Sequence, residues 1–317
     1  MSERNPLRIL VYQGMWNDLP VTEPDDCCCE IWYDRSLWQQ ADAIVFHLPQ
    51  LRTSGFPPRK LPHQFWVAWS MESEANYPML ARRSELTSMF DVWMTYQRHS
   101  DVWCPYFDRS MIARLQAPPI KKTATCPAAA FLSSPFDLSG RRALLDDLMR
   151  EMPVDSYGKI NRNQPLRSGS PRSVKLETIA RYKFTFAFEN SISRDYVTEK
   201  FFDPLLAGSV PVYFGAPNIE DFAPGDKCFI DASHFDTPQA LARYLLHLDA
   251  DEDAYAEYLR WKAQPLRNSF VSMAEQLDNA FARLAKHLHS RMTETTAGAR
   301  ESNSCGDKQI RSSRHRQ

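Results

Sequence analysis

The chain has 317 residues, and its 38 basic side chains nearly balance its 39 acidic ones. This balance argues against a protein that attracts nucleic acid through a strongly positive surface. Hydrophobic residues make up 43% of the chain, which is ample for a packed globular core. At about 150 residues per domain, a chain of this length is expected to form two domains.

The N-terminal segment, MSERNPLRILVYQG, is charged and then enters a strand-like run without an apolar signal-peptide core. Nowhere does the sequence contain about 18 consecutive apolar residues, the length that a transmembrane helix needs. The seven cysteines form an odd set without zinc-type spacing, and adjacent members of Cys27-Cys28-Cys29 cannot readily pair with one another. We therefore expect a cytoplasmic location, and we assign the triple-cysteine run no role.

The N-terminal half alternates strand-like runs with helical or irregular segments, as expected of an α/β domain; the runs are Leu7 to Tyr12, Ala43 to Leu48 and Phe65 to Ser70. Glu72 and Glu74 follow the third run, so both carboxylates should lie near the carboxyl end of a buried strand. From spacing alone, both would be loop residues without a chemical task.

The segment from Pro118 to Pro135 is rich in Pro, Ala, Ser and Thr, which predicts a connection between a first domain, 1–120, and a second, 121–290. Apolar residues at helical spacing predict a last helix from Ser269 to Met292. Residues 293–317 have almost no apolar content, so we expect a disordered tail. Its basic end is suited to weak contact with anionic lipid, although a plain disordered tail explains it more simply.

The segment from Arg181 to Pro217 places polar residues between two apolar runs, which predicts a strand, a loop, a helix and a second strand. The strands are Lys183 to Phe188 and Val210 to Phe214, and the helix should begin near Val197, capped by Asp195 or Thr198, and end at Gly208. A helix N-terminus just beyond a strand suits an anionic ligand such as a phosphate. On charge pattern alone, however, Glu199 and Lys200 are more typical of a solvated helix face.

Within this segment, FAFENS, DYVTEK and AGSVPV resemble the signature of the α1,3/4-fucosyltransferases, glycosyltransferase family ten. VDSYGK at Val154 to Lys159 and FWVAWSMESEANYP at Phe65 to Pro78 resemble further segments of that family. The resemblance covers roughly residues 60 to 270 and is closest to plant and bacterial members. The chain departs from the secreted animal members because it lacks their terminal Cys-x-x-Cys and their membrane anchor.

The resemblance implies an α/β fold of the GT-B type, in which two Rossmann-like domains face each other across a cleft. The first domain would bind mainly the acceptor and the second mainly GDP-fucose. Glu72 matches the family's proposed general base. The positions that match residues of the GDP-fucose site are Arg162, Asn190, Tyr196, Glu199 and Lys200.

A transfer with inversion needs a base for the acceptor hydroxyl, and Glu72 is our candidate, with Glu74 as its rival. Lys200 and Arg162 would stabilise charge on the leaving diphosphate, and Glu199 would accept hydrogen bonds from the ribose hydroxyls. Because the protein supplies these cations, we expect no essential cofactor or divalent metal. The Asp249-Ala-Asp251 sequence superficially resembles a metal motif of other glycosyltransferases, but it should form an exposed turn between helices Pro238 to Leu248 and Asp253 to Lys262.

The sequence thus predicts an inverting α1,3- or α1,4-fucosyltransferase that moves L-fucose from GDP-β-L-fucose to a glycan containing GlcNAc or Glc. The lack of targeting signals favours a bacterial surface polysaccharide as acceptor over the N-glycan core that plant members modify. The expected partners are GDP-fucose and the glycan, with no nucleic acid and with weak membrane contact through the basic tail; the oligomeric state is left open. The alternatives are a catalytically silent nucleotide-sugar-binding protein, which an intact Glu72 disfavours, and a related transferase that uses another nucleotide sugar.

Overall fold

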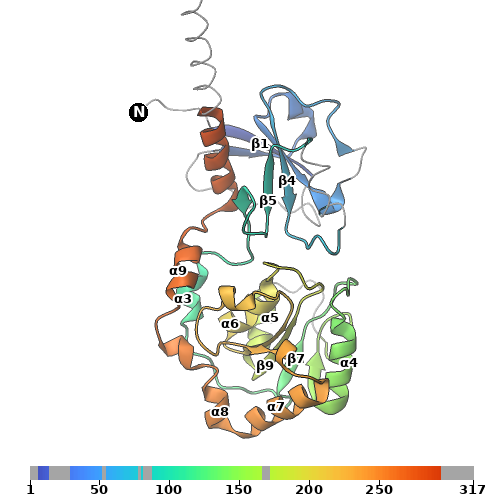
Figure 1. Ribbon diagram of the computed structural model, residues 1–317, viewed down its shortest axis with the longest axis vertical. Helices are drawn as coiled ribbons and strands as arrows, with labels where there is room; N and C mark the ends of the chain where they lie inside the picture. The colour runs from blue at the N-terminus through green and yellow to red at the C-terminus, as the bar shows by residue number, and fades with distance from the viewer. Residues whose placement is uncertain are drawn as a thin grey trace, which may run out of the picture.

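The computed structural model describes residues 6–13, 29–51, 55–77, 80, 88–165 and 172–293. Two parallel β-sheets form the two halves of the described chain, with the first sheet above the second in Figure 1. Within these residues the first sheet has six strands in the order β2-β1-β3-β4-β5-β6, and the second has five in the order β11-β10-β9-β7-β8. Parallel pairing needs crossover connections, and the α/β architecture expected from the sequence follows from it.

The first sheet forms where apolar runs were predicted. Its strands are β1 (Leu7–Gln13), β2 (Cys29–Trp32), β3 (Ala43–His47), β4 (Phe65–Ser70), β5 (Val92–Thr95) and β6 (Val102–Trp103). The three predicted strands are therefore confirmed, except that Leu48 begins the short 3-10 helix η3 (Leu48–Gln50). A second 3-10 helix, η2 (Arg35–Gln39), precedes β3.

The second sheet contains β7 (Ala128–Ala130), β8 (Val154–Ser156), β9 (Phe184–Phe188), β10 (Val210–Phe214) and β11 (Ile230–Asp231). The prediction of a connection over Pro118 to Pro135 is wrong in part, because β7 lies inside this segment and pairs with both β8 and β9. The alanines of β7 are completely buried. Small side chains are suited to an interior strand covered on both faces, but alanine gives a weak strand signal.

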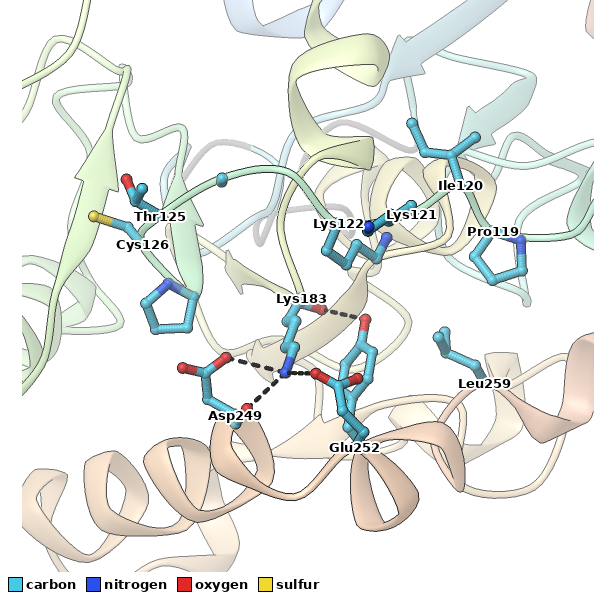
Figure 2. A pocket seen from close by; sticks show the side chains of 13 residues that line it. Pro119, Ile120, Lys121, Lys122, Thr125, Cys126, Lys183, Asp249, Glu252 and Leu259 are labelled. Carbon is cyan, nitrogen blue, oxygen red and sulfur yellow. Dashed lines mark hydrogen bonds and ion pairs between the residues drawn. The ribbon is translucent and has the colours of Figure 1, made fainter.

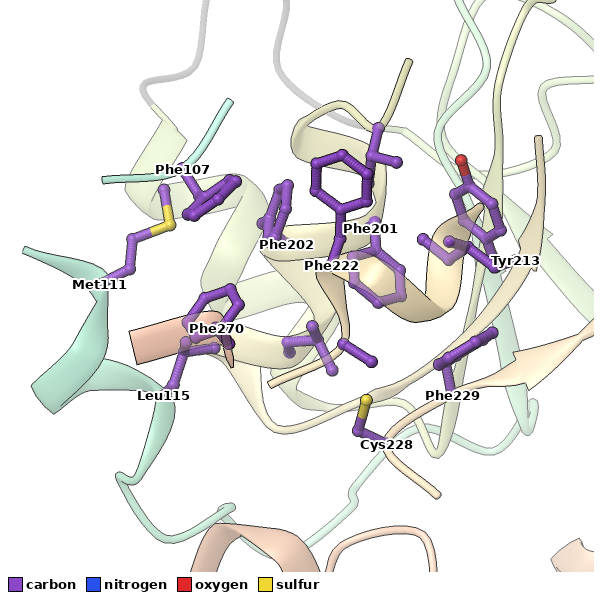
Figure 3. Packing of buried hydrophobic residues seen from close by; sticks show 14 of the residues in the cluster. Phe107, Met111, Leu115, Phe201, Phe202, Tyr213, Phe222, Cys228, Phe229 and Phe270 are labelled. Atoms are coloured by element: carbon purple, nitrogen blue, oxygen red, sulfur yellow. The ribbon is translucent and has the colours of Figure 1, made fainter. Parts of the chain in front are cut away.

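Helices cover both faces of the second sheet: α3 (Met111–Leu115), α4 (Arg141–Glu151), α5 (Arg172–Ala180), α6 (Glu199–Ala207), α7 (Pro238–Ala250), α8 (Glu252–Ala256) and α9 (Asn268–Glu275). Alternate residues of β9 divide the core, because Phe186 packs with α4 and α7 whereas Ala187 packs with α6. Figure 3 shows the α6 side, where Phe107, Phe202 and Phe270 meet. The 3-10 helix η5 (Ile219–Phe222) adds to this cluster.

The last predicted helix, Ser269 to Met292, is divided in two. Helix α9 packs in the second domain through Phe270, whereas helical residues 280–293 pack against the first sheet through Phe281 and Leu284. The side chain of Asn279 begins the second helix, since its Oδ1 accepts hydrogen bonds from the N–H groups of Phe281 (2.9 Å) and Ala282 (3.2 Å). Residues 280–290, which were predicted to belong to the second domain, therefore pack in the core of the first domain.

The prediction of one helix from Asp253 to Lys262 is also wrong, because α8 is followed by turns and by the 3-10 helix η7 (Arg260–Ala263). Asp249 lies in the last turn of α7 rather than in an exposed turn, and its carboxylate is 3.2 Å from Lys183 Nζ. Asp251 caps α8, since its Oδ1 accepts a hydrogen bond of 3.0 Å from Ala254 N. Both carboxylates therefore have structural tasks.

Helix α6 ends at Gly208, which has the left-handed φ of +74° predicted for its C-cap. A Cβ atom there would lie 2.7 Å from Pro119 Cβ and 2.9 Å from Pro119 Cα. We expect Gly208→Ala to lower the free energy of unfolding by about 2 to 3 kcal/mol, from left-handed strain plus this collision, as measured by chemical denaturation. Gly140→Ala is a matched control, because Gly140 has φ +75° but no atom within 4 Å of such a Cβ. Equal losses in the two variants would mean that the Pro119 contact contributes nothing.

Candidate active site between the two domains

The loops that follow β4 and β9 meet between the two sheets. Ser73 Oγ and Ser193 Oγ are 2.9 Å apart, and Asn76 Nδ2 donates a hydrogen bond of 2.8 Å to Asn190 Oδ1. These side chains are buried, so the predicted donor residue Asn190 takes part in a polar contact between the domains. The structure thus joins the carboxyl ends of strands from both sheets, where open parallel sheets bind ligands.

Glu72 and Tyr196, one predicted from each domain, are brought together here. The Tyr196 hydroxyl donates to Glu72 Oε2 at 3.3 Å, and the Tyr196 side chain is only 2% exposed. Its ring packs edge-on against Tyr96, with 5.0 Å between the centroids. Burial, with added repulsion from nearby carboxylates, raises the pKa of Tyr196 well above its usual value, so its hydroxyl remains a hydrogen-bond donor.

Glu74, the rival for the role of base, has a different neighbour. One of its carboxylate oxygens accepts a hydrogen bond from the hydroxyl of Tyr96. Burial and this carboxylate raise the pKa of Tyr96, so its hydroxyl also stays protonated. The contact directs Glu74 toward a buried tyrosine of its own domain, whereas Glu72 is directed toward the predicted donor residue Tyr196. This arrangement favours Glu72 as the base.

The beginning of α6 gathers the charged donor residues. Thr198, not Asp195, is the N-cap: its Oγ1 accepts a hydrogen bond of 3.3 Å from Lys200 N. Lys200 Nζ lies 3.0 Å from Thr198 Oγ1 and 3.2 Å from Glu199 Oε1. Burial alone would raise the pKa of Glu199, but Lys200 and Lys175 lower it to about 2. Both members of the Glu199–Lys200 pair therefore carry charge at neutral pH. The side chain of Glu199 is 37% exposed and that of Lys200 is 20% exposed.

Glu189 belongs to the same cluster and was not predicted. Its carboxylate, which is 0% exposed, accepts hydrogen bonds from Thr198 N at 2.8 Å and from Thr198 Oγ1 at 2.9 Å, and lies 3.4 Å from Lys200 Nζ. A Cβ at Gly215 would be 2.6 Å from Glu189 Cγ, so this packing requires glycine. The available signal was an acidic residue placed directly after a mostly apolar strand, at the edge where ligands bind.

A second unpredicted residue, Arg98, links the loop after β5 to the donor loop. Its guanidinium lies 3.7 Å from the carboxylate of Asp195 and 3.5 Å from that of Asp221, and 4.6 Å from the centre of the Phe222 ring. Asp195 has a left-handed φ of +65° and exchanges two hydrogen bonds of 2.9 Å with Asn218. Arg98 therefore holds the strained turn immediately before Tyr196.

We expect Arg98→Ala to lower kcat/KM by about tenfold, because the turn that carries Tyr196 would lose its ion pair with the first domain and keep only the hydrogen bond of 3.2 Å from the backbone N–H of residue 98 to Asp195. Steady-state kinetics would measure this loss. Arg267→Ala is a matched control: Arg267 also pairs with two carboxylates, Glu220 and Asp226, and is 32% exposed against 34% for Arg98, but all three residues lie in the second domain. A similar loss in both variants would contradict a specific role for Arg98.

Arg162 lies in the loop that follows β8, at the edge of the second sheet. Its side chain is exposed, and its Nε donates a hydrogen bond of 3.1 Å to Gln164 O. The neighbouring segment Ser168 to Pro171 lies outside the described residues. Contact between Arg162 and the donor phosphates stays a prediction.

A cavity of about 390 Å³ lies at the opposite end of the second sheet, next to the amino ends of β7 and β9 (Figure 2). Lys183 Nζ on its wall is 2.6 Å from Glu252 Oε1 and 3.2 Å from Asp249 Oδ1, so this ammonium is already neutralised. A nucleotide is expected at the carboxyl ends of parallel strands, and we do not place the donor in this cavity. Among the described residues, no group of three or more His, Cys, Asp or Glu is arranged to hold a metal ion.

None of the helices that the structure describes is long and apolar enough to cross a membrane.

Both halves of the chain match models of known protein families. Residues 4–107 match the family model "Fucosyltransferase, N-terminal", and residues 120–301 match "Glycosyltransferase family 10 (fucosyltransferase) C-term". The 4-galactosyl-N-acetylglucosaminide 3-alpha-L-fucosyltransferase FUT6 of Pan troglodytes is 35% identical over 79% of this chain and 69% of its own length. The chain spans 45% of the length of the "Putative fucosyltransferase-like protein" of Arabidopsis thaliana and 75% of the length of the 3-galactosyl-N-acetylglucosaminide 4-alpha-L-fucosyltransferase FUT3 of Bos taurus.

Two solved structures support the GT-B fold. A crystal structure of an alpha1,3-fucosyltransferase has a TM-score of 0.63 and 16% identity, covering 90% of this chain and 91% of that one. A second, described with GDP-fucose, has a TM-score of 0.60 and 16% identity, covering 91% and 92%. The expected pair of facing Rossmann-like domains is therefore confirmed. Together with the matches to both family models, this architecture shows that the chain belongs to glycosyltransferase family 10, the fucosyltransferases.

Proposed function

We propose that this chain moves L-fucose from GDP-β-L-fucose to the 3- or 4-hydroxyl of a GlcNAc or Glc unit, with inversion at the transferred carbon. The observation that carries the proposal is the contact across the two domains between Glu72 Oε2 and the Tyr196 hydroxyl at 3.3 Å. It places a carboxylate from the first domain beside a residue that precedes the Glu199–Lys200 pair. One base and one anion-binding cluster are the groups that such a transfer needs.

In the proposed reaction, Glu72 accepts the proton of the acceptor hydroxyl as its oxygen bonds to the anomeric carbon of fucose. The bond from that carbon to the diphosphate oxygen breaks on the opposite face, and GDP leaves with the bonding electrons. Lys200 and the N-terminus of α6 stabilise the negative charge that develops on the diphosphate. Glu199, which is ionised at neutral pH, accepts hydrogen bonds from the ribose hydroxyls.

The proposal includes no divalent metal, because Lys200 supplies a fixed positive charge beside the leaving group. Although burial alone would lower the pKa of Lys200, the carboxylates of Glu199 and Glu189 raise it above its usual value. The ammonium of Lys200 therefore remains charged at neutral pH. Turnover that persists after treatment with EDTA would support this part of the proposal, and complete loss that Mg²⁺ or Mn²⁺ restores would contradict it.

For the acceptor we propose a glycan with GlcNAc or Glc, in particular a bacterial surface polysaccharide. The name of the Pan troglodytes relative specifies a 4-galactosyl-N-acetylglucosaminide and a 3-linked product. This name supports GlcNAc, rather than Glc, as the acceptor sugar and supports the α1,3 linkage. The cytoplasmic location, and weak contact of the tail at 293–317 with the inner face of the membrane, remain predictions. The tail lies outside the described residues except for its first, which ends helical residues 280–293.

The decisive experiment measures GDP release from GDP-fucose with N-acetyllactosamine, N-acetylglucosamine and lactose, and determines the product's anomeric configuration and linkage by NMR. Acceptor-dependent release with an α-linked product from the β-linked donor would support the proposal. GDP-fucose binding without turnover on any acceptor would favour the silent binding protein. Faster turnover of another nucleotide sugar, such as GDP-mannose, would favour the related transferase.

A further inference from the structure

The carboxylate of Glu189 is a buried charge that the reaction described above does not use. It lies between the carboxyl end of β9, the N-terminus of α6 and Gly215, the residue that follows β10. Because the residue is 0% exposed, its carboxylate cannot touch a ligand in the cleft. Any influence on the donor must pass through its neighbours.

The contacts of Thr198 show which neighbours these are. Its hydroxyl is 2.9 Å from both carboxylate oxygens of Glu189, 3.0 Å from Lys200 Nζ and 3.3 Å from Lys200 N. A threonine hydroxyl has one proton and two lone pairs. If that proton goes to Glu189, both lone pairs remain to accept from the ammonium and the N–H of Lys200. The hydrogen bonds then run in one direction, from Lys200 through Thr198 to Glu189.

The surrounding charges make Lys200 the cation that balances Glu189. Lys200 Nζ is 3.4 Å from Glu189 Oε2. The other cation, Arg141, donates to the backbone oxygens of Phe188, Ser134 and Phe136, each at 3.1 Å. The remaining titratable groups that act on this pair are Glu199, the buried tyrosines Tyr196 and Tyr213, and the partly buried Tyr106. A buried carboxylate is costly without a partner, so its charge and that of Lys200 depend on each other.

We propose that Glu189 is a positioning residue of the donor site, which holds the protonated Lys200 ammonium in place for the donor diphosphate, both by charge and through Thr198. This inference rests on the proposed function. A lysine side chain has a flexible four-carbon stem, so fixing its ammonium before the donor binds removes an entropic cost of binding. Glu189 thus acts on the donor without touching it.

The test is Glu189→Gln, which keeps the size of the side chain and removes its charge. We expect GDP binding, measured by calorimetry, to weaken about tenfold at pH 7 and further at pH 9, because Lys200 would lose its proton more readily. The KM for the acceptor should not change. In a Lys200→Arg background, Glu189→Gln should add no pH dependence, because a guanidinium does not titrate in this range.

Thr185→Val is the matched control. It removes a buried hydrogen bond of 2.8 Å, to Ser209 Oγ, toward the amino end of β9, away from α6's N-terminus. A comparable loss of thermal stability in both variants, with weaker GDP binding only in Glu189→Gln, would support the inference. Unchanged GDP binding at both pH values in folded Glu189→Gln would overturn it, as would equal weakening in Thr185→Val.

If Glu189→Gln does not fold, Thr198→Val and Thr198→Ser test the same link. The valine removes the hydroxyl that joins Lys200 to Glu189, and the serine keeps it. Weaker GDP binding in the valine variant alone would support the inference, whereas equal binding in both would overturn it. Failure of the native chain to bind GDP would instead overturn the proposed function, and this inference with it.

Discussion

Replacing Glu72 by Gln should lower kcat by about a thousandfold while leaving the Kd for GDP within about twofold of the native value. The amide keeps the size of the side chain and can still accept a hydrogen bond from the Tyr196 hydroxyl, which is 3.3 Å from Glu72 Oε2. It cannot accept the proton of the acceptor hydroxyl. Single-turnover kinetics with saturating acceptor, together with calorimetry with GDP, would separate the chemical step from donor binding.

Glu74→Gln is the matched control for this prediction. Glu74 is two residues away and also half-buried, but it accepts its hydrogen bond from Tyr96 within the first domain. We expect its kcat to fall by less than about tenfold. A thousandfold loss in Glu74→Gln with a small loss in Glu72→Gln would exchange the roles of the two carboxylates. Small losses in both would mean that neither is the base.

Lys200→Met should weaken GDP binding by about a hundredfold and lower turnover at least as much, since the leaving diphosphate would lose its main counter-charge. The variant should also lose stability in a pH-dependent way. Burial already raises the pKa of Glu189, and removing Lys200 raises it further. A carboxyl whose pKa is higher in the folded chain than in the unfolded chain favours folding at low pH. Stability of Lys200→Met should therefore fall as the pH rises above the ordinary glutamate range, as thermal denaturation across pH would show.

The double variant Lys200→Met with Glu189→Gln distinguishes binding from folding. Removing both charges leaves no unpaired buried carboxylate, so stability and its pH dependence should return toward those of the native chain. GDP binding should stay weak. Recovery of GDP affinity in the double variant would show that Lys200 acts only by neutralising Glu189, and would contradict its role as a phosphate ligand.

The sequence by itself determined much of the local structure. Strand β4 has the predicted bounds, and α6 ends at the predicted Gly208. Each depends on neighbours a few positions away, through apolar alternation or a residue that tolerates positive φ. The family resemblance likewise selected Glu72, Tyr196, Glu199 and Lys200, because their motifs are contiguous strings; their roles remain to be tested.

The sequence pattern gave wrong predictions where two different structural surroundings produce the same pattern of residues. Apolar spacing continues from α9 into helical residues 280–293 because each helix has one buried face, yet the two faces pack in different domains. The three alanines of β7 resembled a linker, since only burial between two neighbouring strands makes small side chains suitable there. In both cases the deciding interaction lay outside the segment.

Only the tertiary structure decided how the candidate site is assembled. Glu72 and Tyr196 are 124 residues apart in the chain, and Arg98 and Asp195 are 97 apart. No local propensity encodes such contacts, because they depend on the packing of both sheets, which sets the loops opposite each other. The buried charge of Glu189 depends on the same packing, since its partners Thr198 and Lys200 begin the next helix. The sequence thus specified the chemical groups of the site, and the packing of the two domains decided which of them meet.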